Sequence, residues 1–211
     1  MNSNKKIARI AGLLYLIVVV TGIISLAYVP SKLIVWNDAS KTYTNIVDNE
    51  MLFRIGILCG LICYTTFVVL PIALYKLLNP VNNTYALLMV VLAVASVPVS
   101  LINIGNKFSV LTLIHKASEL KGVKPGRIQE QVLFQLHLYN NGNQIASIFW
   151  GLWLLPFGYL VFKSAFLPKF LGICLMIGCF GYLIDFAGDL LSPGLQSNDD
   201  CPLHNNTWQY W

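Results

Sequence analysis

The sequence predicts an all-α fold, a polytopic transmembrane helical bundle with about five spans. Of its 211 residues, 56% are hydrophobic and only 11% are charged, whereas soluble domains carry about 25% charged residues. The charges lie between long apolar runs, and about 20 consecutive apolar residues suffice to cross the hydrocarbon core of a bilayer. We therefore expect residues 1–192 to form one transmembrane domain surrounded by the lipid bilayer, with no folded soluble domain.

The first span is expected over about residues 7–29, directly after a basic cluster of Lys5, Lys6 and Arg9. A cleaved signal peptide is the alternative, because the Ser-Leu-Ala tripeptide at 25–27 resembles a cleavage site. The apolar run is longer than the roughly 7–15 residues of a signal-peptide core, which favours a retained helix.

The second and third spans are expected over about residues 51–78 and 85–114. A polar loop at 31–50 precedes them, and an Asn- and Pro-rich turn at 79–83 joins them. The third span is longer than the bilayer requires, so we expect it to tilt, to bend at a proline or to protrude.

Gly56 and Gly60 stand four residues apart in the second span. This spacing allows a neighbouring helix to approach closely. The motif is common in membrane helices, so it predicts packing and nothing more.

The fourth and fifth spans are expected over about residues 145–162 and 170–191. A polar loop at 115–131 lies before them, and we expect the Asn-rich stretch 140–144 to interrupt the following helix. The final segment, 193–211, contains no Lys or Arg and is expected to be a polar tail outside the bilayer.

Basic residues in short loops set the orientation of a membrane protein. The two sides carry similar numbers of Lys and Arg. The basic N-terminal cluster and the Lys-free tail favour a cytoplasmic N-terminus in a bacterial cytoplasmic membrane.

An internal repeat of two helical hairpins, 51–114 and 132–191, is a further hypothesis. The string LPIALY at 70–75 resembles LPFGY at 155–159. Such a repeat would relate the hairpins by a pseudo-two-fold axis along the membrane normal. Chance similarity between apolar segments is the alternative.

Polar residues within the spans are the candidates for a functional site, because such groups are costly in lipid. Since successive spans alternate in direction, all of these residues are expected at one membrane face. We predict that the two acids of the last span face Lys107 or Arg54 across a polar, ligand-binding pocket. The alternative is that the basic side chains extend to the interface and that ion pairs only fix helix register. The candidates are Arg54, Asn103, Asn106, Lys107, Asn140, Asn143, Gln144, Asp185 and Asp189.

Motifs for enzymes are absent: there is no P-loop, GxGxxG, HExxH or GxSxG. No catalytic residue and no cofactor can therefore be assigned. His115 and His137, with Asp185 and Asp189, are weak candidates for a metal site, because these ligand types suit Zn²⁺. No basic stripe with interleaved aromatic residues is present, which excludes nucleic acid as a partner.

Three long strings of the sequence resemble a known bacterial membrane family. They are KKIARIAGLLYLIVVVTGIISLAYVPSKLIV, FRIGILCGLICY with LPIALYKLLNPVN, and IFWGLWLLPFGYLVFKSAFLPKFLGICLMIGCFGYLIDF. The family is catalogued as domain of unknown function 4386, and the resemblance covers about residues 5–187. It implies a small integral inner-membrane protein with no assigned activity.

The family's pattern implies a sixth hydrophobic helix, which a polar tail from about Gly188 replaces here. One hypothesis is a frameshifted or truncated gene product.

Three hypotheses for function remain open. The first is a non-enzymatic protein that binds or moves a small solute, ion or lipid. The second is a small membrane enzyme, of a metal-dependent hydrolase type. The third is an assembly protein that docks on a partner membrane protein or on a second copy through its helices.

Overall fold

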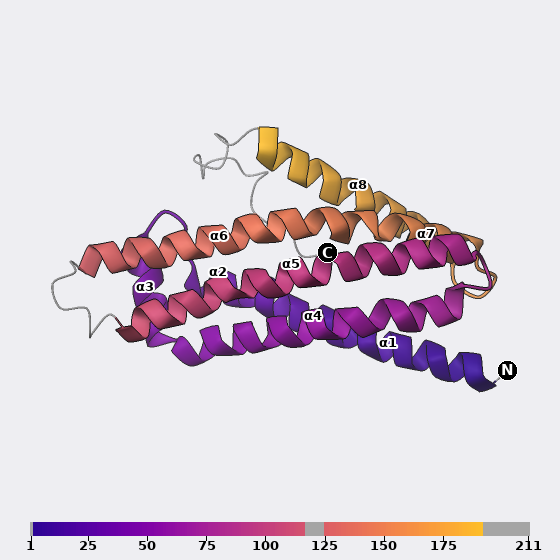
Figure 1. Ribbon diagram of the computed structural model, residues 1–211, viewed down its shortest axis with the longest axis horizontal. Helices are drawn as coiled ribbons and strands as arrows, with labels where there is room; N and C mark the ends of the chain where they lie inside the picture. The colour runs from indigo at the N-terminus through magenta and orange to yellow at the C-terminus, as the bar shows by residue number, and fades with distance from the viewer. Residues whose placement is uncertain (1, 117–124, 192–211) are drawn as a thin grey trace. The chain divides into compact units, whose positions relative to one another are not determined.

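The computed structural model describes residues 2–116 and 125–191, and every regular element in these ranges is a helix (Figure 1). Five of these helical segments are long and apolar enough to cross a membrane. The predicted all-α class and the number of spans are therefore confirmed. The predicted tail, 193–211, lies outside the described residues.

The helices follow one another along the chain with short connections. In order they are α1 (Asn2–Gly22), the π-helix η1 (Ile23–Tyr28), α2 (Val29–Leu33), α3 (Ala39–Asp48), α4 (Glu50–Leu78), α5 (Asn83–Lys116), α6 (Pro125–Leu152), α7 (Leu154–Lys163) and α8 (Lys169–Leu191).

The chain forms two compact units. Among the described residues, unit 1 comprises 2–12, 69–96 and 144–191, and unit 2 comprises 13–68, 97–116 and 125–143. The helices α1, α4, α5 and α6 each contribute residues to both units.

The expected interruption at 140–144 is wrong. The helix α6 begins at Pro125 and continues through this stretch to Leu152. Asparagine has low helix propensity, but Asn143 accepts a hydrogen bond from Asn103 of α5 (Nδ2 to Oδ1, 3.0 Å). This tertiary contact offsets the local preference, so the helix begins 20 residues before the expected span of 145–162.

The segment expected as a polar loop at 31–50 contains a helix, α3. Its N-terminus is capped by Asp38, whose side chain accepts a hydrogen bond from the Lys41 backbone N–H (2.8 Å). The Thr42 hydroxyl is fully buried and bonds both the N–H (2.8 Å) and the carbonyl (2.9 Å) of Val35. Ile46 is also fully buried, so this amphipathic helix packs its inner face within unit 2.

The two glycines of the second span allow close helix packing within unit 2. A Cβ at Gly56 would lie 2.9 Å from the Val29 side chain, and one at Gly60 would lie 2.8 Å from the Ser25 hydroxyl. Both glycines therefore admit the chain's own η1–α2 segment against α4. A partner helix would have to dock on a different face.

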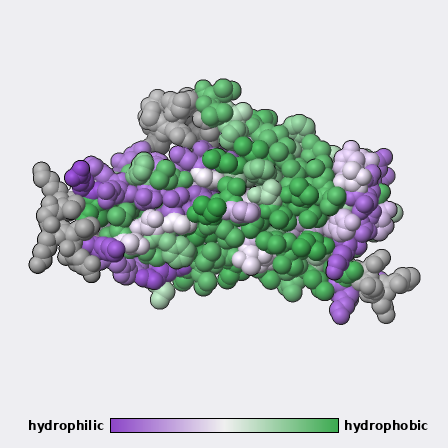
Figure 2. All heavy atoms as spheres, viewed as in Figure 1, coloured by the Kyte–Doolittle hydropathy of each residue, from purple (hydrophilic) through white to green (hydrophobic). Residues whose placement is uncertain are grey.

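The longest of the five candidate spans joins α6 and α7 and covers 38 residues, Gly126–Lys163. A helix of this length spans roughly 57 Å, about twice the thickness of the hydrocarbon core. Figure 2 shows hydrophilic residues gathered over the N-terminal half of α6 and the C-terminal end of α5. We infer that this end of unit 2 stands outside the hydrocarbon.

Unit 1 contains a helical hairpin, α7–α8, with a close backbone approach. A Cβ at Gly172 of α8 would lie 2.6 Å from the carbonyl oxygen of Gly158 in α7. Because that neighbour is backbone, it cannot rotate away as a side chain would.

We predict that Gly172→Ala lowers the free energy of unfolding by about 1–3 kcal/mol, because the added methyl group forces the two helices apart. Gly181→Ala, at an exposed glycine of the same helix with no atom within 4 Å of its Cβ position, is the matched control. Thermal unfolding of the purified protein in detergent checks this. Equal effects of both substitutions would contradict the predicted close approach.

Candidate functional site

Three of the predicted asparagines form one hydrogen-bonded group in unit 2. The Asn103 side-chain amide donates to the Tyr139 carbonyl (2.7 Å) and to Asn143 Oδ1 (3.0 Å). Asn106 Nδ2 donates in turn to Asn103 Oδ1 (3.0 Å). The group links α5 to α6 at a point where both helices carry polar residues.

This asparagine group depends on Gly142. A Cβ at residue 142 would overlap the amide of Asn103. Glycine therefore lets the Asn103 side chain lie directly against the backbone of α6. Asn140 is half-buried on the same helix, while Gln144 belongs to unit 1.

Lys107 is buried beside the asparagine group, with 2% of its surface exposed. Its ammonium Nζ donates to the Ser25 carbonyl (3.3 Å) and lies 4.1 Å from the centre of the Tyr139 ring. Ser25 lies in η1, and π-helical turns often mark functional positions. Within the described part of unit 2, no carboxylate forms an ion pair with Lys107. One carbonyl and one aromatic face compensate only part of the cost of burying this charge.

Arg54 contacts an acid that the sequence analysis did not name as its partner. Arg54 Nε lies 2.6 Å from Glu50 Oε1, and His115 Nε2 lies 3.0 Å from the same oxygen. His115 Nε2 also lies 3.2 Å from Arg54 Nη2. The spacing of Glu50 and Arg54, one helical turn, is a signal that the sequence already contained.

The two acids of the last span lie on α8 in unit 1. Asp185 is exposed on this helix, and the side chain of Asp189 is outside the described residues. Their pairing with Lys107 or Arg54 stays a prediction.

The two histidines of the weak metal hypothesis have separate neighbours in unit 2. The His137 ring lies 5.0 Å from the Trp36 ring, centre to centre, whereas His115 joins Glu50 and Arg54. Among the described residues, no three His, Cys, Asp or Glu side chains come together as a metal site would require.

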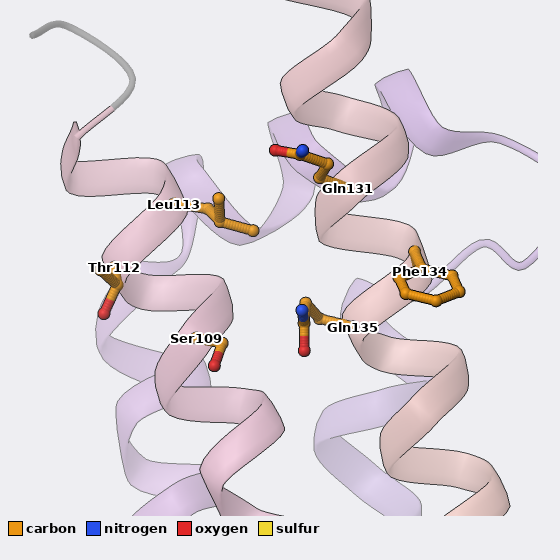
Figure 3. Close-up of a pocket in the computed structure, with 6 residues that line it drawn as sticks. All are labelled: Ser109, Thr112, Leu113, Gln131, Phe134 and Gln135. Carbon is orange, nitrogen blue, oxygen red and sulfur yellow. The ribbon is translucent and has the colours of Figure 1, made fainter. Parts of the chain in front are cut away.

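A hollow of about 390 Å³ lies between α5 and α6 in unit 2 (Figure 3). Ser109 on α5 and Gln135 on α6 face each other across it (Figure 3). The sequence analysis did not name this lining: it expected Gln131 to lie in a loop and the fourth span to begin only at residue 145, whereas α6 begins at Pro125. Its lining residues are Ser109, Thr112, Leu113, Gln131, Phe134 and Gln135.

A second, shallower hollow lies on α4 and α5 in the same unit, with a volume of about 360 Å³. It combines basic side chains with apolar ones. Its lining residues are Arg54, Phe108, Leu111, Thr112, His115 and Lys116.

Comparison with known protein families assigns the chain to one of them. Residues 10–201 match the family described as "Domain of unknown function (DUF4386)". The chain belongs to this family. The match confirms the resemblance and extends beyond residue 187, where the resemblance was expected to end.

This DUF4386 protein is also similar to a protein of Archaeoglobus fulgidus described as "Uncharacterized protein". The two are 29% identical over 118 residues, which cover 56% of this chain and 57% of the relative. The chain thus spans little more than half of the relative's length. No solved structure matches the chain. The family and the fold are therefore shown, and neither indicates a specific activity.

We predict that Lys107→Met leaves the free energy of unfolding unchanged or raises it by up to about 2 kcal/mol. Methionine has a similar length and removes a buried charge that lacks an ionic partner in the described part of unit 2. Lys32→Met, at an exposed lysine of α2, should change stability by less than about 0.5 kcal/mol. Thermal unfolding in detergent measures both. A loss of stability in Lys107→Met alone would show that the ammonium itself holds unit 2 together.

Proposed function

We propose that this DUF4386 protein is a non-enzymatic membrane protein that binds a small, uncharged polar solute between α5 and α6. The observation that carries the proposal is the hollow of about 390 Å³ in unit 2. Its volume lies within the roughly 300–1,000 Å³ typical of small-molecule sites.

The chemistry of the lining supports an uncharged ligand. The residues that line the hollow include two hydroxyls and two side-chain amides and no charged group. The Ser109 hydroxyl donates to the Gly105 carbonyl (3.1 Å), and the Thr112 hydroxyl donates to the Phe108 carbonyl (3.1 Å). Both hydroxyl oxygens are therefore left as acceptors, while the amides of Gln131 and Gln135 can donate.

The hydroxyls of the lining also argue against a nucleophilic role. A catalytic serine needs an adjacent general base, but Ser109 donates its proton to a carbonyl of its own helix. Binding is the role that this geometry supports.

The asparagine group supports the hollow with a fixed arrangement of α5 and α6. Asn106 lies one helical turn before Ser109, and Tyr139, whose carbonyl accepts from Asn103, lies one turn after Gln135. Because the amide of Asn103 bridges the two helices, the lining groups are held before a ligand arrives. Preorganisation of this kind lowers the entropic cost of binding.

Gln135→Leu tests the proposal, because it removes an amide and keeps a side chain of similar size. The purified protein in detergent is presented with glycerol, acetamide and glucose, and binding is followed by saturation-transfer NMR. We expect at least one of these probes to bind the wild type and to lose about tenfold in affinity in the variant, as the loss of a hydrogen bond predicts. Gln129→Leu, on the same helix but outside the lining, is the matched control. If none of the probes binds the wild type, or if both variants behave alike, the proposal fails.

We further propose that the protein resides in a bacterial cytoplasmic membrane with its N-terminus in the cytoplasm. Lys5, Lys6 and Arg9 are exposed at the start of α1, and such clusters are retained on the cytoplasmic side.

An epitope tag at the N-terminus of the full chain, produced in a bacterial host, tests the orientation. We expect protease added to intact spheroplasts to spare the tag and to remove it after permeabilisation. A tag that is digested equally in both conditions would reverse the proposed orientation.

A further inference from the structure

We propose that the hollow on α4 and α5 binds the phosphate of an anionic phospholipid from the surrounding bilayer. This site is separate from the solute site and rests on different residues, apart from Thr112, which both hollows share. Three basic side chains, Arg54, His115 and Lys116, line it.

The site carries an excess of positive charge. Arg54 and Lys116 contribute two charges, and Glu50 offsets one of them through Arg54 Nε at 2.6 Å. Arginine has five N–H donors. Among the described residues, Nε contacts Glu50 and Nη2 contacts His115, so Nη1 can donate to a phosphate oxygen.

Lys116 supplies a second cation at the same place. It is the last residue of α5 and is exposed. No carboxylate within the described ranges forms an ion pair with it. A flexible ammonium at this position can therefore follow a phosphate group held by Arg54.

Apolar surface continues from these cations along the two helices. Phe108 lines the hollow and is 48% exposed. Ile55 and Leu58 follow Arg54 on α4 and are 43% and 56% exposed. A phospholipid matches this pattern, because its phosphate would lie at the cations while its acyl chains contact the exposed apolar side chains.

The depth of the site agrees with a lipid head group. His115 lies eight residues beyond Lys107 on α5, or roughly 12 Å along the helix. The basic residues of α5, Lys107, His115 and Lys116, all lie in its C-terminal third, and two of them end the helix, which places this end of α5 near the membrane surface. Under the proposed orientation this end of α5 lies at the outer face of the membrane, so the phosphate would belong to a lipid of the outer leaflet.

Native mass spectrometry of the full chain in detergent tests the proposal, with dioleoyl-phosphatidylglycerol titrated against dioleoyl-phosphatidylcholine. We expect the anionic lipid to reach half occupancy at a concentration at least fivefold lower than the zwitterionic one. Lys116→Gln and Arg54→Gln should each weaken the binding of phosphatidylglycerol about fivefold, as expected for one interfacial cation. Lys32→Gln, at an exposed lysine outside the hollow, is the control and should leave it unchanged.

Glu50→Gln distinguishes a lipid site from a set of contacts that only holds α4 against α5. Removal of the competing carboxylate should tighten phosphatidylglycerol binding about fivefold. If the Glu50–Arg54–His115 contacts only join α4 to α5, this variant will lose thermal stability and gain no lipid affinity, which overturns the proposal.

Two further outcomes would also overturn it. Equal binding of the two lipids, or equal weakening by Lys32→Gln and Lys116→Gln, would show general surface charge. Displacement of phosphatidylglycerol by inorganic phosphate at equal concentration would show that the ligand is the free anion. Gln135→Leu should not alter lipid binding, so failure of this proposal and failure of the solute site are distinguishable.

Discussion

The structure of unit 2 depends on how polar groups near the hydrocarbon are satisfied. The Asn103 amide joins α5 to α6 by bonding both the Tyr139 carbonyl and the Asn143 side chain. Tyr139 also places its ring under the ammonium of Lys107, which bonds η1 in turn. Because an unmet polar group is expensive in lipid, these contacts fix the register of α5 against α6. That register also determines which side chains line the hollow between the two helices.

The polar end of unit 2 therefore has two surfaces of different chemistry on either side of α5. The surface toward α6 presents neutral amides and hydroxyls. The surface toward α4 presents cations above exposed apolar side chains. Neutral groups suit a solute that arrives from water without charge, whereas cations suit a bilayer phosphate. One helix can thus contact both phases, and the two sites share only Thr112 among their lining residues.

Several features could be predicted from the sequence because they depend on local pattern. The five spans follow from the lengths of apolar runs. The alternating directions of successive spans predict Asn103 and Asn143 at one membrane face, but not that the two side chains bond each other. The continuity of α6 could not be predicted, since its Asn-rich stretch is held by a contact 40 residues away in sequence. The helix α3 was missed because Asp38 and Thr42 stabilise it through a cap and a turn. The position of Lys107 over Tyr139 requires the α5–α6 register, which no spacing within one helix reveals.

The unbroken course of α6 has a consequence for changes in chain length. From Pro125 to Leu152 every residue is tied to the same helical phase, and each residue advances that phase by about 100°. Deleting one residue between Gln135 and Tyr139 would leave the asparagine contact in place and rotate the glutamines away from α5. A continuous helix of this kind accepts many changes of side chain at its exposed positions, but an insertion or deletion shifts every later residue around the helix axis. Changes in chain length are therefore expected outside α6.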